Sequence, residues 1–378
     1  MERINMKKLL VIAKSLGGGG SEVALVEFLN HLDESKYDVT LLLLDKDIEY
    51  KYRLKKKLKI KYIEFDNKIY HLLASMYALP GKILKKIGFN KYFPIYDFLA
   101  KHSKMPSLPH YDIAIDFYGY GAFTTAFLAL NVKADKKAFW LHDEQMPWIV
   151  NVERYFNAYD KIFGVSKAIK NTFDSMYPKY KKSSVFYNVI NLESILKKST
   201  EFYPKELKKS VFNIVTVGRL TEQKGYDISI KAAKRLRDEK VHFKWFAIGN
   251  GKDRRKLEKL IRKFNLSDRF ILLGRRNNPY PYIKECDLFV LPSRHEGYSV
   301  ALVEARALEK CIVTSNFPAN MEQIKDGKNG LISKLNDEDL ARCIKDIYLN
   351  PELKSKLEKN VIQEKINFDD QINKLDEI

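Results

Sequence analysis

Two glutamates separated by seven residues, Glu296 and Glu304, lie in a stretch that reads RHEGYSVALVE. The preceding apolar run CDLFVLPS predicts a buried strand, and Ser299 begins a predicted helix. The first turn of a helix offers unpaired backbone N–H groups and a positive dipole end to an anion. Gly297 lets the backbone approach a ligand closely, and carboxylates accept hydrogen bonds from sugar hydroxyls. The pattern therefore predicts a pocket for a phosphorylated sugar with its two carboxylates at different depths. A solvated helix position for Glu304 is the alternative, which its apolar neighbours disfavour.

Two cations lie five residues apart in a second predicted loop, GRLTEQKG, which follows another apolar run. Ligands of parallel sheets bind outside the carboxyl ends of the strands. Arg219 and Lys224 would then hold a diphosphate, the first as a planar fork and the second as a point charge. An ordinary surface loop with two cations is the alternative.

The elements that position these loops form two series of strand, loop and helix. Apolar segments that alternate with helical patterns predict doubly wound parallel sheets, so the fold class is α/β with two Rossmann-like domains facing across a cleft. The 378 residues also suit two domains better than one core. We expect domains at 1–193 and 194–358, joined by a polar linker at 191–210, and a helix at 359–378 that returns to the first domain. The predicted strands lie at 7–13, 37–45, 60–66, 111–119, 136–143, 161–166, 183–190, 212–218, 243–249, 270–274, 286–293 and 311–315.

Composition restricts the class of protein. The three cysteines have no disulfide or zinc spacing, which is typical of a reducing cytosol. The N-terminal apolar stretch is too short for a signal peptide, and no run is long enough to span a membrane. The net charge of +19 favours nucleic acid, an anionic membrane or a polyanionic substrate, or reflects a solvated basic surface.

Residues 51–100 contain 12 Lys and Arg against 3 Asp and Glu, a net charge of +9. Within them, residues 69–105 interleave aliphatic and aromatic side chains with lysines and fit neither series of strands. This composition is typical of a basic amphipathic element on a membrane surface, and a helical insertion packed on the domain would look similar.

Four segments in order carry a resemblance to a known family: TVGRLTEQKG, AIGNGKDRRKLEKL, CDLFVLPSRHEGYSVALVEA and MEQIKDGKNGLI. Together they resemble the family 4 retaining glycosyltransferases of GT-B fold, whose E-x7-E signature matches Glu296 and Glu304. The resemblance implies transfer of a sugar from a nucleoside diphosphate donor, with retention at the anomeric carbon. It implies an acceptor-binding first domain and a nucleotide-sugar-binding second domain.

The resemblance also implies roles for single residues. Arg219 and Lys224 would neutralise the leaving diphosphate, Glu304 would bind the ribose and Glu296 the hydroxyls of the donor sugar. Stabilisation of this kind is electrostatic and needs no metal or other cofactor. The remaining residues implied at the donor site are Gly218, Arg276, Tyr298, Ser299, Val300 and Ala301.

In the first domain the run Gly17 to Gly20 resembles the family's glycine loop, which implies Gly18 at the donor, and His142 resembles the histidine of the sugar pocket. A glycine-rich turn and a structural histidine are the alternatives. The sequence departs from the family where Val189 replaces a glycine after Asn188 and where NFPANMEQI lacks a glycine pair. The DKD at 45–47 resembles a metal-binding DxD, but we expect an ordinary loop there.

The resulting expectation is a cytoplasmic enzyme, peripheral to the inner face of the cell membrane. It would move a hexose or N-acetylhexosamine, from UDP in the first instance, to a lipid-linked or polysaccharide acceptor of the envelope or capsule. Its partners are the donor, the acceptor and an anionic membrane, with no nucleic acid. The alternatives are a GT-B sugar-nucleotide epimerase and a non-catalytic basic protein that binds membrane or nucleic acid.

Overall fold

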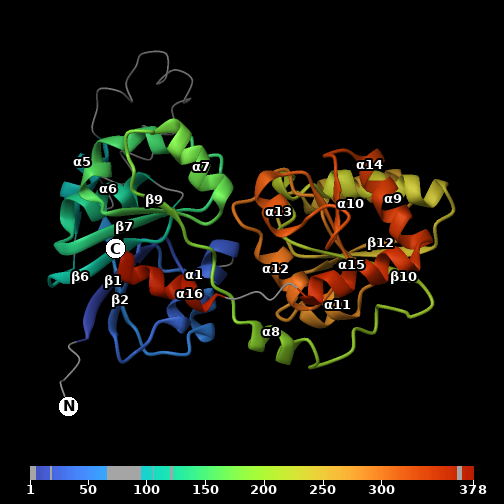
Figure 1. Cartoon of the computed structure of the whole chain (residues 1–378), viewed down its shortest axis with the longest axis horizontal. Helices are drawn as coiled ribbons and strands as arrows, with labels where there is room; N and C mark the ends of the chain where they lie inside the picture. The colour runs from blue at the N-terminus through green and yellow to red at the C-terminus, as the bar shows by residue number, and fades with distance from the viewer. Residues whose placement is uncertain (1–5, 18, 66–94, 105, 120–121, 364–367) are drawn as a thin grey trace. The chain divides into compact units, whose positions relative to one another are not determined.

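The computed structural model describes residues 6–17, 19–65, 95–104, 106–119, 122–363 and 368–378. It divides into two compact units, Met1–Ile190 with Phe368–Ile378 and Asn191–Asn367. In each unit helices cover a parallel sheet (Figure 1). The expected α/β class with two parallel-sheet domains is confirmed.

The first unit contains a seven-stranded sheet in the order β3-β2-β1-β6-β7-β8-β9, with every neighbouring pair parallel. The apolar runs at its centre form these strands because both faces of a parallel sheet are covered; Leu9 to Ile12 and Leu41 to Leu43 are fully buried. The strands are β1 (Lys7–Ala13), β2 (Tyr37–Leu43), β3 (Lys59–Tyr62), β6 (Tyr111–Asp116), β7 (Ala134–Leu141), β8 (Lys161–Gly164) and β9 (Ser183–Val185).

The helices of the first unit lie between these strands along the chain, except for α16, which is contributed by the C-terminal residues. They are α1 (Gly20–His31), α5 (Ile95–His102), α6 (Ala122–Asn131), α7 (Lys167–Met176) and α16 (Asp369–Asn373), and a short antiparallel pair joins β4 (Glu64–Phe65) to β5 (Ser103–Lys104). Most of the predicted basic insertion, 69–94, lies outside the described residues. Its C-terminal part is α5, which packs against α6.

The second unit contains a six-stranded parallel sheet in the order β12-β11-β10-β13-β14-β15. This is the Rossmann strand order, in which successive strands are added toward one edge of the sheet up to the third and toward the other edge from the fourth onward. The strands are β10 (Phe212–Val217), β11 (Phe243–Ile248), β12 (Phe270–Gly274), β13 (Leu288–Leu291), β14 (Ile312–Ser315) and β15 (Leu331–Ser333). The helices are α8 (Leu192–Lys198), α9 (Tyr226–Asp238), α10 (Arg254–Lys263), α11 (Tyr280–Glu285), α12 (Val300–Ala307), α13 (Pro318–Gln323), α14 (Asp337–Leu349) and α15 (Pro351–Gln363).

The observed boundaries differ from the expected ones by a few residues. The first division falls after Ile190 because α8, within the segment expected to be a linker, packs against α11 and α12. The second falls after Asn367, since α15 continues through the expected boundary at 358. Gln371 accepts a hydrogen bond from the Tyr187 amide, and Lys374 donates to the Val185 carbonyl. The last residues thus belong to the first unit.

None of the helices that the structure describes combines the length and the apolar character that crossing a bilayer requires.

Candidate active site

The loop after β10 presents Lys224 at the carboxyl edge of the second sheet. The 3-10 turn Glu222–Lys224 ends at Gly225, which has φ +67°. A Cβ atom at Gly225 would lie 2.0 Å from the carbonyl oxygen of Pro292, so glycine is required both by the dihedral angle and by the approach of the next loop. The aliphatic stem of Lys224 lies over Gly218, where its Cδ is 3.4 Å from the place of a Cβ.

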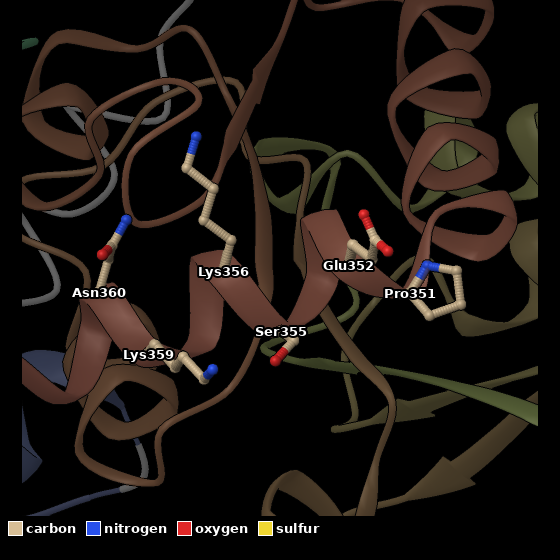
Figure 2. A pocket seen from close by; sticks show the side chains of 6 residues that line it. All are labelled: Pro351, Glu352, Ser355, Lys356, Lys359 and Asn360. Carbon is tan, nitrogen blue, oxygen red and sulfur yellow. The ribbon is translucent and has the colours of Figure 1, made fainter.

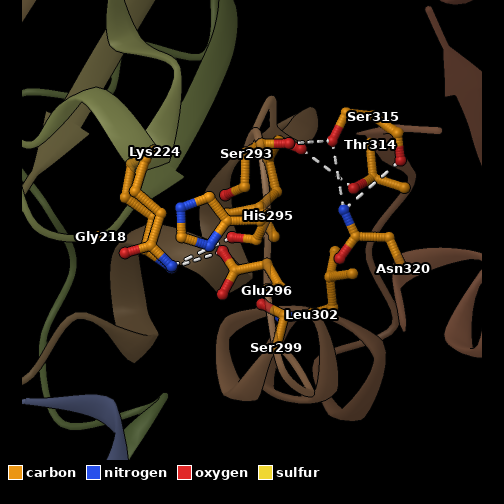
Figure 3. Close-up of polar contacts among 12 residues, drawn as sticks. Gly218, Lys224, Ser293, His295, Glu296, Ser299, Leu302, Thr314, Ser315 and Asn320 are labelled. Atoms are coloured by element: carbon orange, nitrogen blue, oxygen red, sulfur yellow. Dashed lines mark hydrogen bonds and ion pairs between the residues drawn. The ribbon is translucent and has the colours of Figure 1, made fainter. Parts of the chain in front are cut away.

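The loop after β13 brings Glu296 to Lys224. Lys224 Nζ and Glu296 Oε1 are 2.5 Å apart, and the two side chains are 15% and 8% exposed (Figure 3). Because β10 and β13 are neighbours in the sheet, this ion pair lies at the point where the strand order reverses. Crevices at that point are the usual ligand sites of such sheets.

Glu304 is also buried, which excludes the solvated helix position considered above. Its side chain in α12 accepts a hydrogen bond of 3.1 Å from the hydroxyl of Tyr280 in α11. The helix begins at Val300, one residue later than expected, and Ser299 caps it by accepting from the Leu302 amide at 3.4 Å. The amides of Val300 and Ala301 have no acceptor within the helix, so they can donate to an anion.

Tyr298 is half-buried before this helix, and burial raises the pKa of its hydroxyl to about 12. The phenol is therefore neutral at physiological pH and acts as a hydrogen-bonding group rather than an acid or base.

An ion pair that the sequence did not indicate joins the two loops beside Lys224. Arg294 Nη1 and Nη2 each lie 2.8 Å from a carboxylate oxygen of Asp227, and Nη1 also donates to the Glu222 carbonyl at 2.6 Å. The bidentate geometry fixes both position and direction. The pair therefore holds the turn that carries Lys224 against the loop that carries Glu296.

Two glutamines, the half-buried Gln223 and the buried Gln323, hold the Glu296 loop. Gln223 donates to the His295 carbonyl at 3.1 Å and Gln323 donates to the Ser299 carbonyl at 3.2 Å. Gln323 comes from the segment in which the sequence departs from the family. Ser315 in the same region donates to the Ser293 carbonyl at 2.5 Å (Figure 3). In the sequence, Gln223 and Gln323 lie in segments that follow predicted strands and Ser315 ends one, and these positions were the available signal.

Arg219 and Arg276 lie apart from the ion pair. Arg219 is exposed, and within the described ranges it makes no ion pair. Arg276 follows β12, which is separated from β10 by β11, and it pairs with Glu206 at 3.3 Å. Strands are about 4.8 Å apart, so β12, which precedes Arg276, is roughly 10 Å from β10, which precedes Lys224.

The predicted histidine of the first unit lies at the carboxyl edge of its own sheet. His142 follows β7 and is 4% exposed, and its Nε2 lies 2.7 Å from the Phe117 carbonyl. A carbonyl oxygen only accepts, so Nε2 carries the proton. Burial lowers the pKa of His142 to about 4, which makes the ring neutral at pH 7. Gly18 lies outside the described residues.

The first unit also buries a carboxyl group that was not among the predicted site residues. Asp116 ends β6 and accepts hydrogen bonds from the hydroxyls of Thr124 and Thr125, at 3.1 and 2.7 Å. Burial raises its pKa to about 6, against the opposing effect of these hydrogen bonds. A carboxylate within the apolar strand predicted at 111–119 was the available signal.

A pocket of about 560 Å³ lies elsewhere in the second unit, on one face of α15 (Figure 2). None of the predicted site residues lines it, and it combines both signs of charge with small polar groups. It is lined by Pro351, Glu352, Ser355, Lys356, Lys359 and Asn360.

Comparison with known proteins relates part of the chain to a known family. Residues 198–364, which include the whole Lys224–Glu296–Glu304 region, match the family described as glycosyl transferases group 1. Solved structures share the fold over nearly the whole chain. Anabaena HepE, solved with UDP and glucose, has a TM-score of 0.75 at 15% identity and 98% coverage of both chains. TarM has a TM-score of 0.73 at 13% identity, over 100% of this chain and 99% of its own. The fold is that of the GT-B glycosyltransferases.

Curated relatives are similar to the chain in sequence. One is the N-acetylgalactosamine-N,N'-diacetylbacillosaminyl-diphospho-undecaprenol 4-alpha-N-acetylgalactosaminyltransferase of Campylobacter jejuni, 26% identical over 88% of this chain and 87% of its own. Another is an uncharacterized glycosyltransferase of Methanocaldococcus jannaschii, 34% identical over 55% of this chain and 56% of its own. The chain is thus a relative of curated glycosyltransferases.

Proposed function

We propose that the protein is a retaining glycosyltransferase of family 4. Its donor is a nucleoside diphosphate sugar, a UDP-sugar in the first instance, and the group transferred is a hexose or N-acetylhexosamine. The acceptor is a lipid-linked or polysaccharide glycan of the cell envelope or capsule. The observation that carries the proposal is the buried Lys224–Glu296 ion pair where the strand order reverses, with Glu304 in the helix that follows.

The donor's diphosphate and sugar would engage the two partners of this ion pair separately. The diphosphate offers Lys224 a stronger anionic partner, while Glu296 turns to the hydroxyls of the sugar. The amides of Val300 and Ala301 add donors toward the phosphates. As the glycosidic bond breaks, negative charge grows on the diphosphate, and fixed positive groups stabilise it without a metal ion.

The nucleoside end of the donor would be held by Glu304, whose carboxylate accepts hydrogen bonds from the two ribose hydroxyls. Arg219 is exposed in the loop that carries Lys224 and would reach a phosphate by rotation of its long side chain. In the first unit the neutral His142 ring would hydrogen-bond the donor sugar.

The relatives support the choice of acceptor. Two Campylobacter jejuni relatives are named as acting on diphospho-undecaprenol-linked sugars, and a Rhizobium meliloti relative is named for lipopolysaccharide core biosynthesis. An enzyme with such an acceptor would work in the cytoplasm at the inner face of the membrane.

The test is a transfer assay with UDP-glucose, UDP-galactose and their N-acetylamino analogues, each with and without a diphospho-undecaprenol-linked glycan. We expect UDP release that depends on the acceptor, a mass increase of one sugar on the lipid, and retained anomeric configuration in the product by NMR coupling. Interconversion of the UDP-sugars without acceptor would indicate an epimerase and overturn the proposal. Absence of release with every donor and acceptor would do so as well.

A further inference from the structure

Helix α10 of the second unit presents one strongly basic side to solvent. Five exposed cations follow its helical period and, with 3.6 residues per turn, fall within an arc of roughly 120°, and a sixth, Lys252, is exposed two residues before the helix begins. Leu257 and Ile261 point the opposite way into the core of the unit. We define the six exposed residues as the α10 cationic face: Lys252, Arg255, Lys256, Lys259, Arg262 and Lys263.

The positive charge of this face is not balanced by ion pairs with the residues of the unit that the structure describes. Residues 252–263 contain seven cations and two acids, a net +5 of the chain's +19. Of the two acids, Glu258 pairs with Arg254, which is not on the face. Across the part of the chain that the structure describes, none of the six residues makes an ion pair.

On the neighbouring helices, by contrast, basic side chains are neutralised by ion pairs with acidic ones. Cations of α9 and α14 pair with nearby acids at 2.6 Å, in Lys234–Asp238, Arg235–Asp337 and Lys345–Glu239. Like charges three and four residues apart on a helix repel each other and destabilise it. The α10 cationic face therefore carries an intrahelical repulsion that an anionic partner would relieve.

The N-terminal end of this face lies beside the candidate active site. The Asp253 amide donates to the Leu220 carbonyl at 3.0 Å, and the Leu220 amide donates to Asn250 at 3.0 Å. Leu220 belongs to the loop that carries Arg219 and Lys224. The residues just before α10 are thus fixed to the loop of the donor site, and α10 itself packs against α9 (Figure 1).

We propose that the α10 cationic face docks the second unit on an anionic bilayer surface; the choice of a bilayer rests on the lipid-linked acceptor of the proposed function. The face contains only long, flexible cations, which suit a diffuse layer of lipid phosphates, each basic residue near the surface contributing to binding. It contains no aromatic side chain on which bases of single-stranded nucleic acid would stack. Docking here would hold the donor-site loop near the membrane that contains the acceptor.

The experiment is sedimentation of the full chain with phosphatidylcholine vesicles, with and without phosphatidylglycerol. The test variant is Lys256→Glu, Lys259→Glu and Lys263→Glu. The control is Lys205→Glu, Lys208→Glu and Lys209→Glu, which changes three exposed lysines of the same unit and gives the same net charge.

We expect salt-sensitive binding to the phosphatidylglycerol vesicles alone, weakened on the order of tenfold or more in the α10 variant and much less in the control. Equal binding by wild type and the α10 variant would overturn the proposal, as would equal losses in both variants. Binding of inorganic polyphosphate without binding to vesicles would overturn it too.

A second readout separates this inference from the proposed function. With the acceptor in detergent micelles and no vesicles present, UDP release from the donor should be unchanged in both variants, since none of the six residues belongs to the donor site. Normal donor turnover with no vesicle binding refutes the α10 assignment alone. Vesicle binding that depends on the face, in a chain without transferase activity, refutes the proposed function alone.

Discussion

At the scale of single residues, Lys224 is the side chain on which the proposed chemistry depends most. Replacing it with alanine removes a fixed positive charge next to the departing diphosphate. We expect kcat to fall by roughly 10²–10³, the usual effect of losing one such stabilising group. Steady-state kinetics of UDP release measures this, with Lys209→Ala as the control at an exposed lysine of the same unit. Turnover within twofold of wild type would refute the role of Lys224.

Substitution of Glu296 should have a different effect, because Glu296 is paired with Lys224 in the structure. In Glu296→Ala the Lys224 ammonium has no buried carboxylate partner, so free UDP should bind at least as tightly as it does to wild type. Turnover of UDP-sugar should nevertheless fall, since the sugar hydroxyls lose their acceptor. Calorimetry with UDP, alongside kinetics with the UDP-sugar, checks both parts. Weaker binding of free UDP would show that Glu296 contacts the nucleotide.

At the scale of elements, the Arg294–Asp227 pair should act as one positioning unit. Both side chains are about 30% exposed, and their contact joins the turn after β10 to the loop after β13. We expect Arg294→Gln and Asp227→Asn each to lower kcat/KM roughly tenfold, and the double variant to be little worse than either. This corresponds to a coupling of about 1–2 kcal/mol, within the range for contacting residues.

The double-mutant cycle has a matched control in Arg235–Asp337, a pair of the same chemistry between α9 and α14. Its removal should leave kcat/KM unchanged. Additive effects of Arg294→Gln and Asp227→Asn would contradict a shared positioning role.

The elements also show how far the sequence could predict the site. Continuous apolar runs such as LLVIA predicted parallel strands, and the change from CDLFVLPS to SVALVEA predicted the helix that contains Glu304. These elements were predictable because the apolar residues that an element buries recur along the sequence with the period of that element. Contacts between distant residues were not predictable. Lys224 meets Glu296 across 72 positions only because β10 and β13 are neighbours in the sheet. The separation of Arg276 from the ion pair was not predictable for the same reason. Arg276 follows β12, the strand at the edge of the sheet, and its side chain pairs with Glu206.

At the scale of the whole molecule, two buried groups of the first unit have opposite effects on stability. The native Asp116 carboxyl has a pKa raised from 3.8 to about 6, so its favourable contribution is full below 3.8 and is lost as pH rises through 6. The native His142 ring has a pKa lowered from 6.5 to about 4, so its contribution is full above 6.5 and is lost as pH falls through 4. Each amounts to roughly 3 kcal/mol.

We therefore expect the free energy of unfolding of the first unit to vary little between pH 4 and 6 in wild type. In Asp116→Asn it should rise with pH across this window, and in His142→Gln it should fall. Urea unfolding measures this through Trp140 and Trp148 in a Trp245→Phe background, which removes the second unit's tryptophan. Parallel slopes in the two variants would contradict the assignment of these groups.

The central claim is that the carboxyl edge of the second sheet binds a nucleoside diphosphate through Glu304 and Lys224. Calorimetric titration of wild type, Glu304→Ala and Glu338→Ala with UDP, GDP and ADP tests it most directly. Glu338 is an exposed glutamate of the same unit and serves as the control. We predict that one nucleotide, UDP first, binds wild type and the control equally, and binds Glu304→Ala at least tenfold more weakly because a charged hydrogen bond to ribose is lost. Equal binding by all three proteins, or no binding of any nucleotide to wild type, would contradict the account.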